Sequence, residues 1–470
     1  MRGTIFSDLL ASITERGRAV LGLPQRETQG ADGQTSIVDL CERLLSGRGE
    51  ASGTALARAV LDAYDHLNEA GKKDFFLMLA ESFGSDKSAL LEAVDRWTQE
   101  ETTERATELH YRSEPRRQEL LRRLNYAAGG TAALVKMRET LLGHLPSHPA
   151  LRAVDRDFVH LFSSWFNRGF LVLRRIDWTS PAIVLEKIIR YEAVHQILGW
   201  DDLRRRLDPP DRRCYAFFHP ALLDEPLIFV EIALCHEVPS AIQPLLAHDR
   251  TGVPAGKAKT AVFYSISNCQ QGLSGVSFGN FLIKQVVEEL RRDLPGIKTF
   301  ATLSPVPGFV RWMRTVAMAG MSAQDRAGVA FLDDPQWWTE PCLVAKTRPP
   351  LERLARQYFL DARLPDGRPV DPVARFHLGN GARLERINWI GDISPKGIQE
   401  SAGLMVNYLY DLDWIEANHE AYANNGEIVA SPEVRSPFSP DSPGNTLPGR
   451  SSRRGNAPKR ISPPVGTRSK

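Results

Sequence analysis

Apolar side chains recur at helical spacing through the first 166 residues of the chain. Behind Ser36, which can cap a helix, and ahead of Gly47, five of them share one helical face: Ile37, Leu40, Cys41, Leu44 and Leu45. The same spacing returns within 56–67, 75–83, 90–97 and 134–142. Strand-like alternation is absent from this part of the sequence. The pattern therefore predicts an antiparallel bundle of amphipathic helices over residues 1–166.

After residue 166 the pattern changes to short strand-like runs. They are rich in aromatic and β-branched residues and fall at 214–219, 227–236, 261–267 and 299–303. A stretch with helical spacing, 281–294, lies between the last two runs. Residues 261–303 thus predict a strand, a glycine-bearing loop, a helix and a strand in a right-handed crossover. We expect an α+β protein whose bundle is followed by a mixed α/β domain over residues 167–430.

The charge of the chain is uneven along its length. The 470 residues have a net charge of +2, yet residues 431–470 carry eight Lys or Arg against Glu433 and Asp441, a balance of +6 that leaves −4 for residues 1–430. Eight prolines and a single aromatic residue give this segment too little apolar surface to offset its ordering entropy. Because it also lacks the interleaved aromatic residues of a nucleic-acid groove, we expect a solvated, disordered tail.

Cysteine usage and hydropathy predict a reduced, cytoplasmic protein. Five scattered cysteines show neither the spacing of a zinc site nor that of a redox dithiol: Cys41, Cys214, Cys235, Cys269 and Cys342. Charged residues interrupt the first 23 positions, which disfavours a secretory signal. No stretch approaches the roughly 20 apolar residues that a membrane span needs. We expect no metal site and no membrane contact.

The loop 270–279 is the most distinctive segment of the predicted crossover. It holds Gly272, Gly275 and Gly279 between a predicted strand and a predicted helix. Such a backbone can point consecutive N–H groups at an anion, and the start of a helix adds unpaired donors. The loop predicts a phosphate or pyrophosphate site, although a turn that needs glycine only for packing would use the same residues. Its spacing fits neither a P-loop nor a dinucleotide fingerprint.

Residues 271–276 resemble the turn with which the GNAT acetyltransferase superfamily cradles the pyrophosphate of coenzyme A. The wider sequence resembles the malonyl-CoA decarboxylase family, in order from about residue 170 to 410. Six blocks carry this second resemblance: Phe-Tyr-Ser-Ile-Ser at 263–267, the loop at 270–279, Leu-Ser-Pro-Val-Pro-Gly-Phe at 303–309, Phe-His-Leu-Gly-Asn-Gly-Ala at 376–382, Arg-Ile-Asn-Trp at 386–389 and Gly-Leu-Met-Val-Asn-Tyr at 403–408.

The family resemblance implies a helical bundle used in oligomerisation, followed by a GNAT-like mixed α/β catalytic domain. That domain would convert malonyl-CoA to acetyl-CoA and CO2, in fatty acid metabolism, without a metal or organic cofactor. The matching positions imply a catalytic Ser304, a catalytic His377 and an active-site Tyr410. The implied substrate contacts are Ser304 and the loop residues Ser274, Gly275, Val276, Ser277, Phe278, Gly279 and Asn280.

One position departs from the family pattern. Members often have a glutamate that partners the catalytic histidine where this chain has Ser277. Another group must then orient His377, and a water bridge from Ser277 is one way to do so.

The chemistry of decarboxylation suits these residue types. Loss of CO2 from a malonyl thioester leaves an enolate, which needs donors at the thioester oxygen and a proton at carbon. Ser304 precedes a rigid Pro-Val-Pro-Gly turn, and His377 can exchange a proton near neutral pH. Asn380 and Asn388 offer further donors. No Gly-x-Ser-x-Gly elbow surrounds Ser304, which disfavours a serine hydrolase.

Two other functions would use the same loop. A GNAT-type acyltransferase would pass the acyl group to an amine, and a non-catalytic sensor would bind acyl-CoA without turnover. The resemblance favours the decarboxylase, assembled as a homo-oligomer and, by analogy with the family, as a tetramer. The sequence leaves open which residue protonates carbon and whether methylmalonyl-CoA is accepted.

Overall fold

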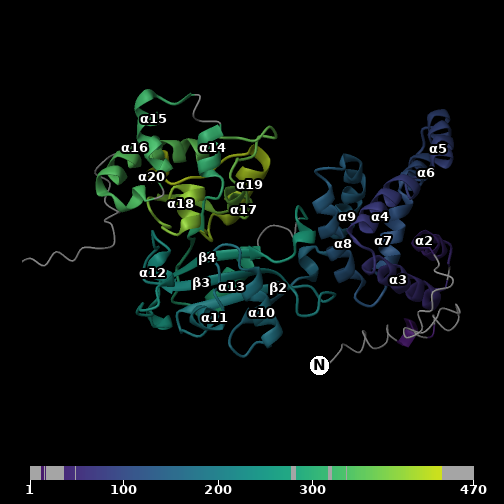
Figure 1. The fold of residues 1–470 in the computed structure, drawn as a ribbon, viewed down its shortest axis with the longest axis horizontal. Coiled ribbons are helices and arrows are strands. Elements are labelled where there is room, and N and C mark those ends of the chain that lie inside the picture. The colour runs from purple at the N-terminus through teal and green to yellow at the C-terminus, as the bar shows by residue number, and fades with distance from the viewer. Residues whose placement is uncertain are drawn as a thin grey trace, which may run out of the picture.

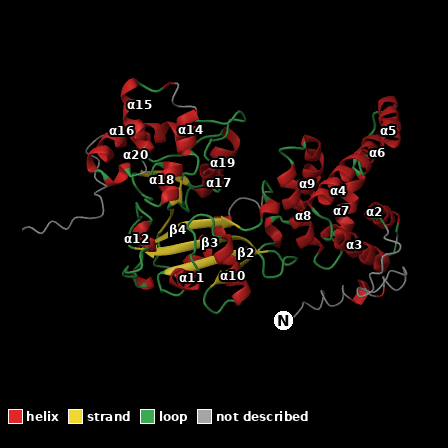
Figure 2. Cartoon of the chain, in the orientation of Figure 1, coloured by secondary structure: helices red, strands yellow, loops and turns green. Residues whose placement is uncertain are grey.

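The computed structural model describes residues 12–14, 16, 36–47, 49–276, 282–315, 320–334 and 336–436. A helical bundle lies beside a sheet that is itself covered by further helices (Figure 1). Within the described residues, strands begin only after the bundle has ended (Figure 2). The predicted fold class, an all-α part followed by a mixed α/β domain, is confirmed.

The bundle consists of amphipathic helices, as the spacing predicts. In its described part these are α2 (Ile37–Ser46), α3 (Glu50–Asp65), α4 (Glu69–Ser82), α5 (Lys87–Gln99), α6 (Thr103–Ser113), α7 (Arg116–Leu124), α8 (Gly130–His144) and α9 (Arg152–Trp165). The Ser36 hydroxyl accepts a hydrogen bond from the Val38 amide, and Gly47 follows the last residue of α2. Both ends of α2 are therefore where its capping residues predict them.

The sheet combines antiparallel and parallel strands. Its strands are β1 (Val172–Ile176), β2 (Arg212–Phe218), β3 (Pro226–Cys235), β4 (Thr260–Asn268), β5 (Thr299–Thr302), β6 (Ser304–Pro305), β7 (Arg383–Asn388) and β8 (Met405–Leu409). The spatial order is β1-β2-β3-β4-β5-β8-β6, and β7 pairs with β8. Strands β1 to β4 are antiparallel, whereas β4 and β5 run parallel.

The predicted crossover is present and leaves a gap in the sheet. Helix α13 (Leu282–Asp293) lies between β4 and β5 in the sequence, as expected. Pairing between these strands starts at Thr260 and ends at Phe263, although β4 continues to Asn268. No strand of the described chain pairs with this edge of β4 beyond Phe263. The two parallel strands thus separate, and the free edge of β4 faces the opening.

The two faces of the sheet belong to different clusters of buried side chains. Helices α10 (Ala182–Tyr191) and α11 (Trp200–Leu207) pack on the face that presents Cys214 and Ala216 of β2. The alternate residue Phe217 belongs to the main core, which also contains α13. That core continues through the bundle without interruption. The bundle and the mixed domain therefore share one hydrophobic core.

Further helices lie beside the sheet (Figure 1). They are α12 (Gln243–Leu246), α14 (Phe309–Thr315), α15 (Ala323–Val329), α16 (Pro341–Leu360), α17 (Pro372–Gly379), α18 (Pro395–Ser401), α19 (Ile415–Asn425) and α20 (Pro432–Arg435). Helix α20 packs on β7 and buries Val434. The described structure thus continues past the predicted boundary at residue 430 as far as residue 436, and residues 437–470 of the predicted tail lie outside the described residues.

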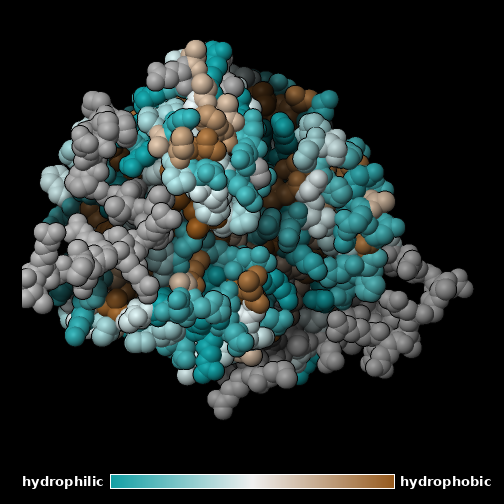
Figure 3. All heavy atoms as spheres, turned by 60° about the vertical axis from the view of Figure 1, so that its left-hand side comes forward, coloured by the Kyte–Doolittle hydropathy of each residue, from teal (hydrophilic) through white to brown (hydrophobic). Residues whose placement is uncertain are grey.

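The surface seen in Figure 3 is mainly polar, as expected from a sequence without long apolar stretches. Figure 3 shows one face that is mainly hydrophilic, with hydrophobic residues in small separate patches. In the part of the chain that the structure describes, no helix is both long enough and apolar enough to span a membrane.

Candidate active site

Three predicted residues, far apart in the sequence, form one buried chain of hydrogen bonds. The Oγ atom of Ser304 lies 3.1 Å from Nε2 of His377. The other ring nitrogen, Nδ1, lies 2.8 Å from the hydroxyl oxygen of Tyr410. The imidazole is 2% exposed, so the whole chain is shielded from bulk water.

Local structure explains how these side chains meet. Ser304 opens β6, which pairs with β8, and Tyr410 follows β8 directly, with its amide donating to the carbonyl of Phe300 in β5. His377 lies in the last turn of α17, whose first turn is capped by the carboxylate of Asp371. Sheet pairing thus fixes the serine and the tyrosine, while a capped helix brings in the histidine.

Two residues that the sequence did not single out complete the arrangement. The Ser304 hydroxyl donates to Oγ1 of Thr302, at 2.8 Å, and the ring of Tyr408 stacks on His377 with centroids 4.5 Å apart. Thr302 stands two positions before Ser304 on the same run, so the alternation of a strand could have indicated it. Nothing local to Tyr408 points to a histidine 31 positions earlier.

The hydrogen-bond directions define one proton arrangement. Since Ser304 donates to Thr302, its Oγ accepts from Nε2–H of His377, and Nδ1 accepts from the hydroxyl of Tyr410. Burial lowers the pKa of His377 to about 3, so the ring is neutral at physiological pH, as this arrangement requires. Burial also raises the pKa of Tyr410 well above its ordinary value, which keeps its hydroxyl protonated.

The orientation of His377 therefore has a direct source. Tyr410 bonds Nδ1 and Tyr408 stacks on the ring. Ser277, considered above as a substitute for the family glutamate, lies outside the described residues together with Phe278, Gly279 and Asn280.

Ser304 and His377 face a small pocket, here called the inner pocket, of about 240 Å³. Its lining residues are Val194, Phe263, Tyr264, Ile266, Asn268, Ser304, Pro305, Pro372, Val373, Phe376 and His377. Most of these side chains are apolar, and neither Lys nor Arg is among them. A ligand group in the inner pocket would meet uncharged polar side chains on one side and hydrocarbon on the other.

A second cavity, the outer cleft, has a volume of about 460 Å³ and reaches the glycine-bearing turn. Residues that line it include Asn268, Gln271, Ser274, Gly275, Val276, Leu282, Arg375, Phe376 and Asn380. Asn268 and Phe376 line both cavities, so the outer cleft and the inner pocket adjoin. Strand β4 lines the inner pocket and ends at Asn268, where the two cavities meet.

The two described glycines of the turn have different roles. Gly275 has a φ of +76°, and a Cβ there would meet no atom within 4 Å, so its backbone conformation requires glycine. A Cβ at Gly272 would lie 1.9 Å from the carbonyl oxygen of Val135 in α8, so this glycine is required by packing. The packing explanation left open by the sequence therefore holds for Gly272, and phosphate binding by the turn stays a prediction.

The remaining predicted donors lie in different places. Asn380 lines the outer cleft, and its side-chain amide donates to the carbonyl of Phe376. Asn388 instead donates to Asn407 of β8 and is not among the residues that line either cavity. Only Asn380 is thus placed where it could contact a ligand.

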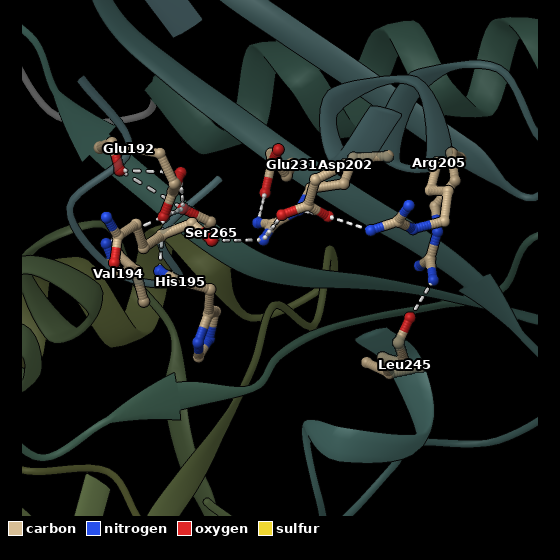
Figure 4. Close-up of polar contacts among 12 residues, drawn as sticks. Glu192, Val194, His195, Asp202, Arg205, Glu231, Leu245 and Ser265 are labelled. Atoms are coloured by element: carbon tan, nitrogen blue, oxygen red, sulfur yellow. Dashed lines mark hydrogen bonds and ion pairs between the residues drawn. The ribbon is translucent and has the colours of Figure 1, made fainter. Parts of the chain in front are cut away.

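A buried polar network holds the wall of the inner pocket that contains Val194. The carboxylate of Glu192 accepts hydrogen bonds from the amides of Val194 and His195 and from the hydroxyl of Ser265 in β4 (Figure 4). A separate ion pair joins Glu231 of β3 to Arg206 of α11. The network attaches the loop after α10 to the sheet, and so fixes Val194 opposite the catalytic candidates.

Metal coordination has no candidate site in the part of the chain described. Among these residues, no group of three or more His, Cys, Asp or Glu side chains is placed to hold an ion. The expectation of a metal-free protein stays a prediction.

Comparison with known proteins identifies relatives over most of the chain. Residues 83–166 match a family model described as the malonyl-CoA decarboxylase N-terminal domain, and residues 169–446 match the one described as its C-terminal domain. The curated protein "Malonyl-CoA decarboxylase, mitochondrial" from Anser anser anser is 38% identical over 410 residues, which cover 78% of this chain and 80% of that protein.

Solved structures give the same result. The crystal structure of malonyl-CoA decarboxylase from Rhodopseudomonas palustris is 58% identical in sequence and has a TM-score of 0.83. The match covers 85% of this chain and 98% of the chain in that crystal structure. The enzyme of the same name from Agrobacterium vitis is 57% identical, with a TM-score of 0.81 and coverage of 85% and 99%.

Proposed function

The chain belongs to the malonyl-CoA decarboxylase family, and we propose that it is a carboxy-lyase that converts malonyl-CoA to acetyl-CoA and CO2. One observation carries the proposal beyond family membership. The buried chain Ser304–His377–Tyr410 ends in the inner pocket, and this pocket adjoins the cleft at the glycine-bearing turn.

The two cavities suit the two ends of a coenzyme A thioester. The phosphates would lie in the outer cleft, where the turn around Gly275 offers main-chain donors and Arg375 adds a positive charge. The acyl end would occupy the inner pocket beside Ser304 and His377.

The gap in the sheet supplies the link between these ends. Beyond Tyr264, the edge of β4 that no described strand pairs with follows the inner pocket to Asn268, where the outer cleft begins. The pantetheine arm of coenzyme A contains two amides. We propose that they pair with this edge in the manner of an added strand.

The site can then carry out the reaction with neutral groups. The bond between C2 and the carboxyl carbon breaks, and CO2 leaves. The electron pair of the broken bond stays with C2 and forms the thioester enolate. Ser304 gives its hydroxyl proton to C2, Nε2–H of His377 replaces that proton, and a proton from solvent restores the imidazole. Because Tyr410 donates to Nδ1, it stabilises the negative charge that develops on the ring meanwhile.

The walls of the inner pocket favour the same step. With neither Lys nor Arg among the lining residues described, the malonyl carboxylate would lose hydration without gaining an ion pair. The product CO2 is neutral, so it does not have this desolvation cost. Removal of the charge from the carboxyl group therefore becomes easier in this pocket than in water.

We propose that the reaction needs neither a metal nor an organic cofactor, since the steps above use only side chains of the protein. Activity should then survive exhaustive dialysis against a chelator. If dialysis abolished the activity and an added divalent metal restored it, this part of the proposal would be wrong.

Incubation of the purified protein with malonyl-CoA alone tests the function. We expect release of CO2 and stoichiometric acetyl-CoA by mass analysis, without any acceptor. Formation of acylated amine only after an amine is added would support a GNAT-type acyltransferase instead. Binding without turnover across a range of pH would support a non-catalytic acyl-CoA sensor.

The cellular setting is also proposed. A cytoplasmic enzyme of fatty acid metabolism is consistent with the five cysteines, all of which are free thiols in the structure. The goose and mouse relatives are named as mitochondrial proteins. Cell fractionation with immunodetection distinguishes these locations, and recovery in an organelle or membrane fraction would contradict the proposal.

A further inference from the structure

The turn at the outer cleft is held by a side chain from the helical bundle. Nη1 of Arg138, in α8, donates to the carbonyl oxygens of Gly272 and Ser274, each at 2.8 Å. Its Nε donates to the carboxylate of Asp155 in α9, also at 2.8 Å. The arginine is 2% exposed, so water does not compete for these bonds. One buried cation therefore joins two bundle helices to the turn.

Backbone packing makes the same connection. The short 3-10 helix η4 (Gln271–Leu273) rests on α8, and Gly272 touches the α8 backbone so closely that no Cβ would fit. The turn is thus built against the bundle and not only between β4 and α13. Its position depends on α8.

The direction of the carbonyl groups determines where the amides point. A peptide unit is planar and trans, so the N–H of Gly275 points opposite to the carbonyl of Ser274. Since that carbonyl faces Arg138, the Gly275 N–H faces away from α8. Gly275 and Ser274 line the outer cleft. The guanidinium also places a positive charge behind the turn, which favours an anion in front of it.

We propose that Arg138 is a positioning residue for substrate binding: it fixes the turn that receives the phosphate end of the coenzyme A thioester. This inference rests on the proposed function and deepens it, because it makes the bundle a part of the substrate site. Arg138 itself contacts no substrate in this proposal.

A merely structural role must be distinguished from positioning, because a buried ion pair that is broken destabilises a protein in any case. The bundle offers a matched control in Arg117 of α7. It is 7% exposed, and its Nε donates to the carboxylate of Asp157 in α9. This pair also joins two bundle helices, but its partner is not in the turn.

The experiment compares wild type, Arg138→Gln and Arg117→Gln on two substrates: malonyl-CoA and malonyl-pantetheine, which lacks the phosphates and the nucleotide. We expect Arg138→Gln to raise KM for malonyl-CoA about tenfold, or about 1.4 kcal/mol, with kcat within twofold. Kinetics with malonyl-pantetheine should be those of wild type. Arg117→Gln should have the wild-type KM and kcat for both substrates, even if its melting temperature is lower.

Three results would overturn the inference: an unchanged KM in Arg138→Gln, an equal rise in Arg117→Gln, or an equal loss with malonyl-pantetheine. If Arg138→Gln does not fold, Arg138→Lys decides. A lysine keeps the charge, but its single ammonium cannot reproduce the guanidinium that bonds the two carbonyls through Nη1 and Asp155 through Nε, so KM should rise by several-fold for malonyl-CoA alone. No rise would overturn the inference.

The failure of the proposed function would be seen separately. Calorimetric titration of coenzyme A into the same three proteins requires no turnover. Weaker binding in Arg138→Gln alone would support the positioning role even if wild type released no CO2, and equal binding by all three would overturn it. A wild type that neither binds coenzyme A nor releases CO2 would overturn both.

Discussion

At the residue scale, the site depends on a histidine that is oriented without a carboxylate. Tyr410 bonds Nδ1 of His377 at 2.8 Å, and Ser304 lies at Nε2. A carboxylate partner would favour the imidazolium, whereas a tyrosine in a dry pocket leaves the ring neutral. This arrangement suits a relay in which Nε2–H of His377 replaces the proton that Ser304 gives, while Tyr410 stabilises the transient negative charge on the ring.

Replacement of His377 should therefore separate catalysis from binding. We expect His377→Asn to lower kcat by about 10²–10⁴, the usual contribution of a positioned proton donor. The dissociation constant of coenzyme A should change by less than twofold, because the proposed binding mode places the phosphates in the outer cleft, away from His377. Tyr410→Phe, which leaves the ring in place, should lower kcat less. Near-normal turnover by His377→Asn would contradict the assignment.

The pH dependence of the rate follows from the low pKa of His377. Burial depresses this pKa to about 3, below the usual value of 6.5, so the neutral ring persists as pH falls from 8 to 5. We expect kcat/KM to show no acid limb with a midpoint near 6.5 over that range. A limb at pH 6–7 that disappears in His377→Asn would show that the ring titrates normally and would contradict the account.

Some of the site could not be predicted from local sequence. Ser304 and His377 are 73 positions apart, and the resemblance of two separate blocks, not their own spacing, indicated that they meet. Val194 was missed altogether, because it stands outside those blocks and reaches the inner pocket through the hydrogen bonds of Glu192. Contacts of this kind are set by the fold and leave no local pattern.

At the element scale, helix α17 positions His377, and its cap can be tested. The Asp371 carboxylate accepts from the Ala374 amide at 2.7 Å and from the buried hydroxyl of Tyr358. We expect Asp371→Ala to lower the free energy of unfolding by about 0.5–2 kcal/mol, as loss of a cap usually does, and to lower kcat. Denaturant unfolding measures the first effect.

Asn is as good a cap as Asp, so Asp371→Asn is the matched control. It should retain most of the stability and most of the activity. An Asp371→Ala protein as stable and as active as wild type would show that the cap does not hold α17 in place.

The elements that sequence reasoning predicted are those with a clear buried face. Helix α2 buries Leu40, Cys41 and Leu44 at the expected spacing, and β4 is buried along most of its length. Helix α6 was missed, since it buries no residue and so has no apolar stripe to recognise. Strand β6 consists of Ser304 and Pro305 alone, which is too short for any periodicity.

At the scale of the whole molecule, helices α5 and α6 pack mainly against each other in the part of the chain that the structure describes. They contact each other, and between them only Ala93 is buried. Leu91 is 55% exposed and Tyr111 69% exposed. Exposed large apolar side chains favour association, so these two helices are candidates for contacts in the expected homo-oligomer.

Light scattering at micromolar concentration tests this expectation. We predict the mass of a tetramer for wild type and a smaller assembly for Leu91→Glu, because a charge would have to be buried in the interface. A wild-type protein that is monomeric would contradict the prediction. A tetramer that persists unchanged in Leu91→Glu would place the interface elsewhere.

The position of the bound malonyl group is the most direct test of the proposed site. A crystal structure with a malonyl-CoA analogue that cannot lose CO2 measures this directly. We predict phosphates at the turn around Gly275, and the malonyl carboxylate in the inner pocket within hydrogen-bond distance of Ser304 or His377. A malonyl group in the larger cavity beside Arg311 and Arg314, about 1340 Å³ in volume, would contradict the account.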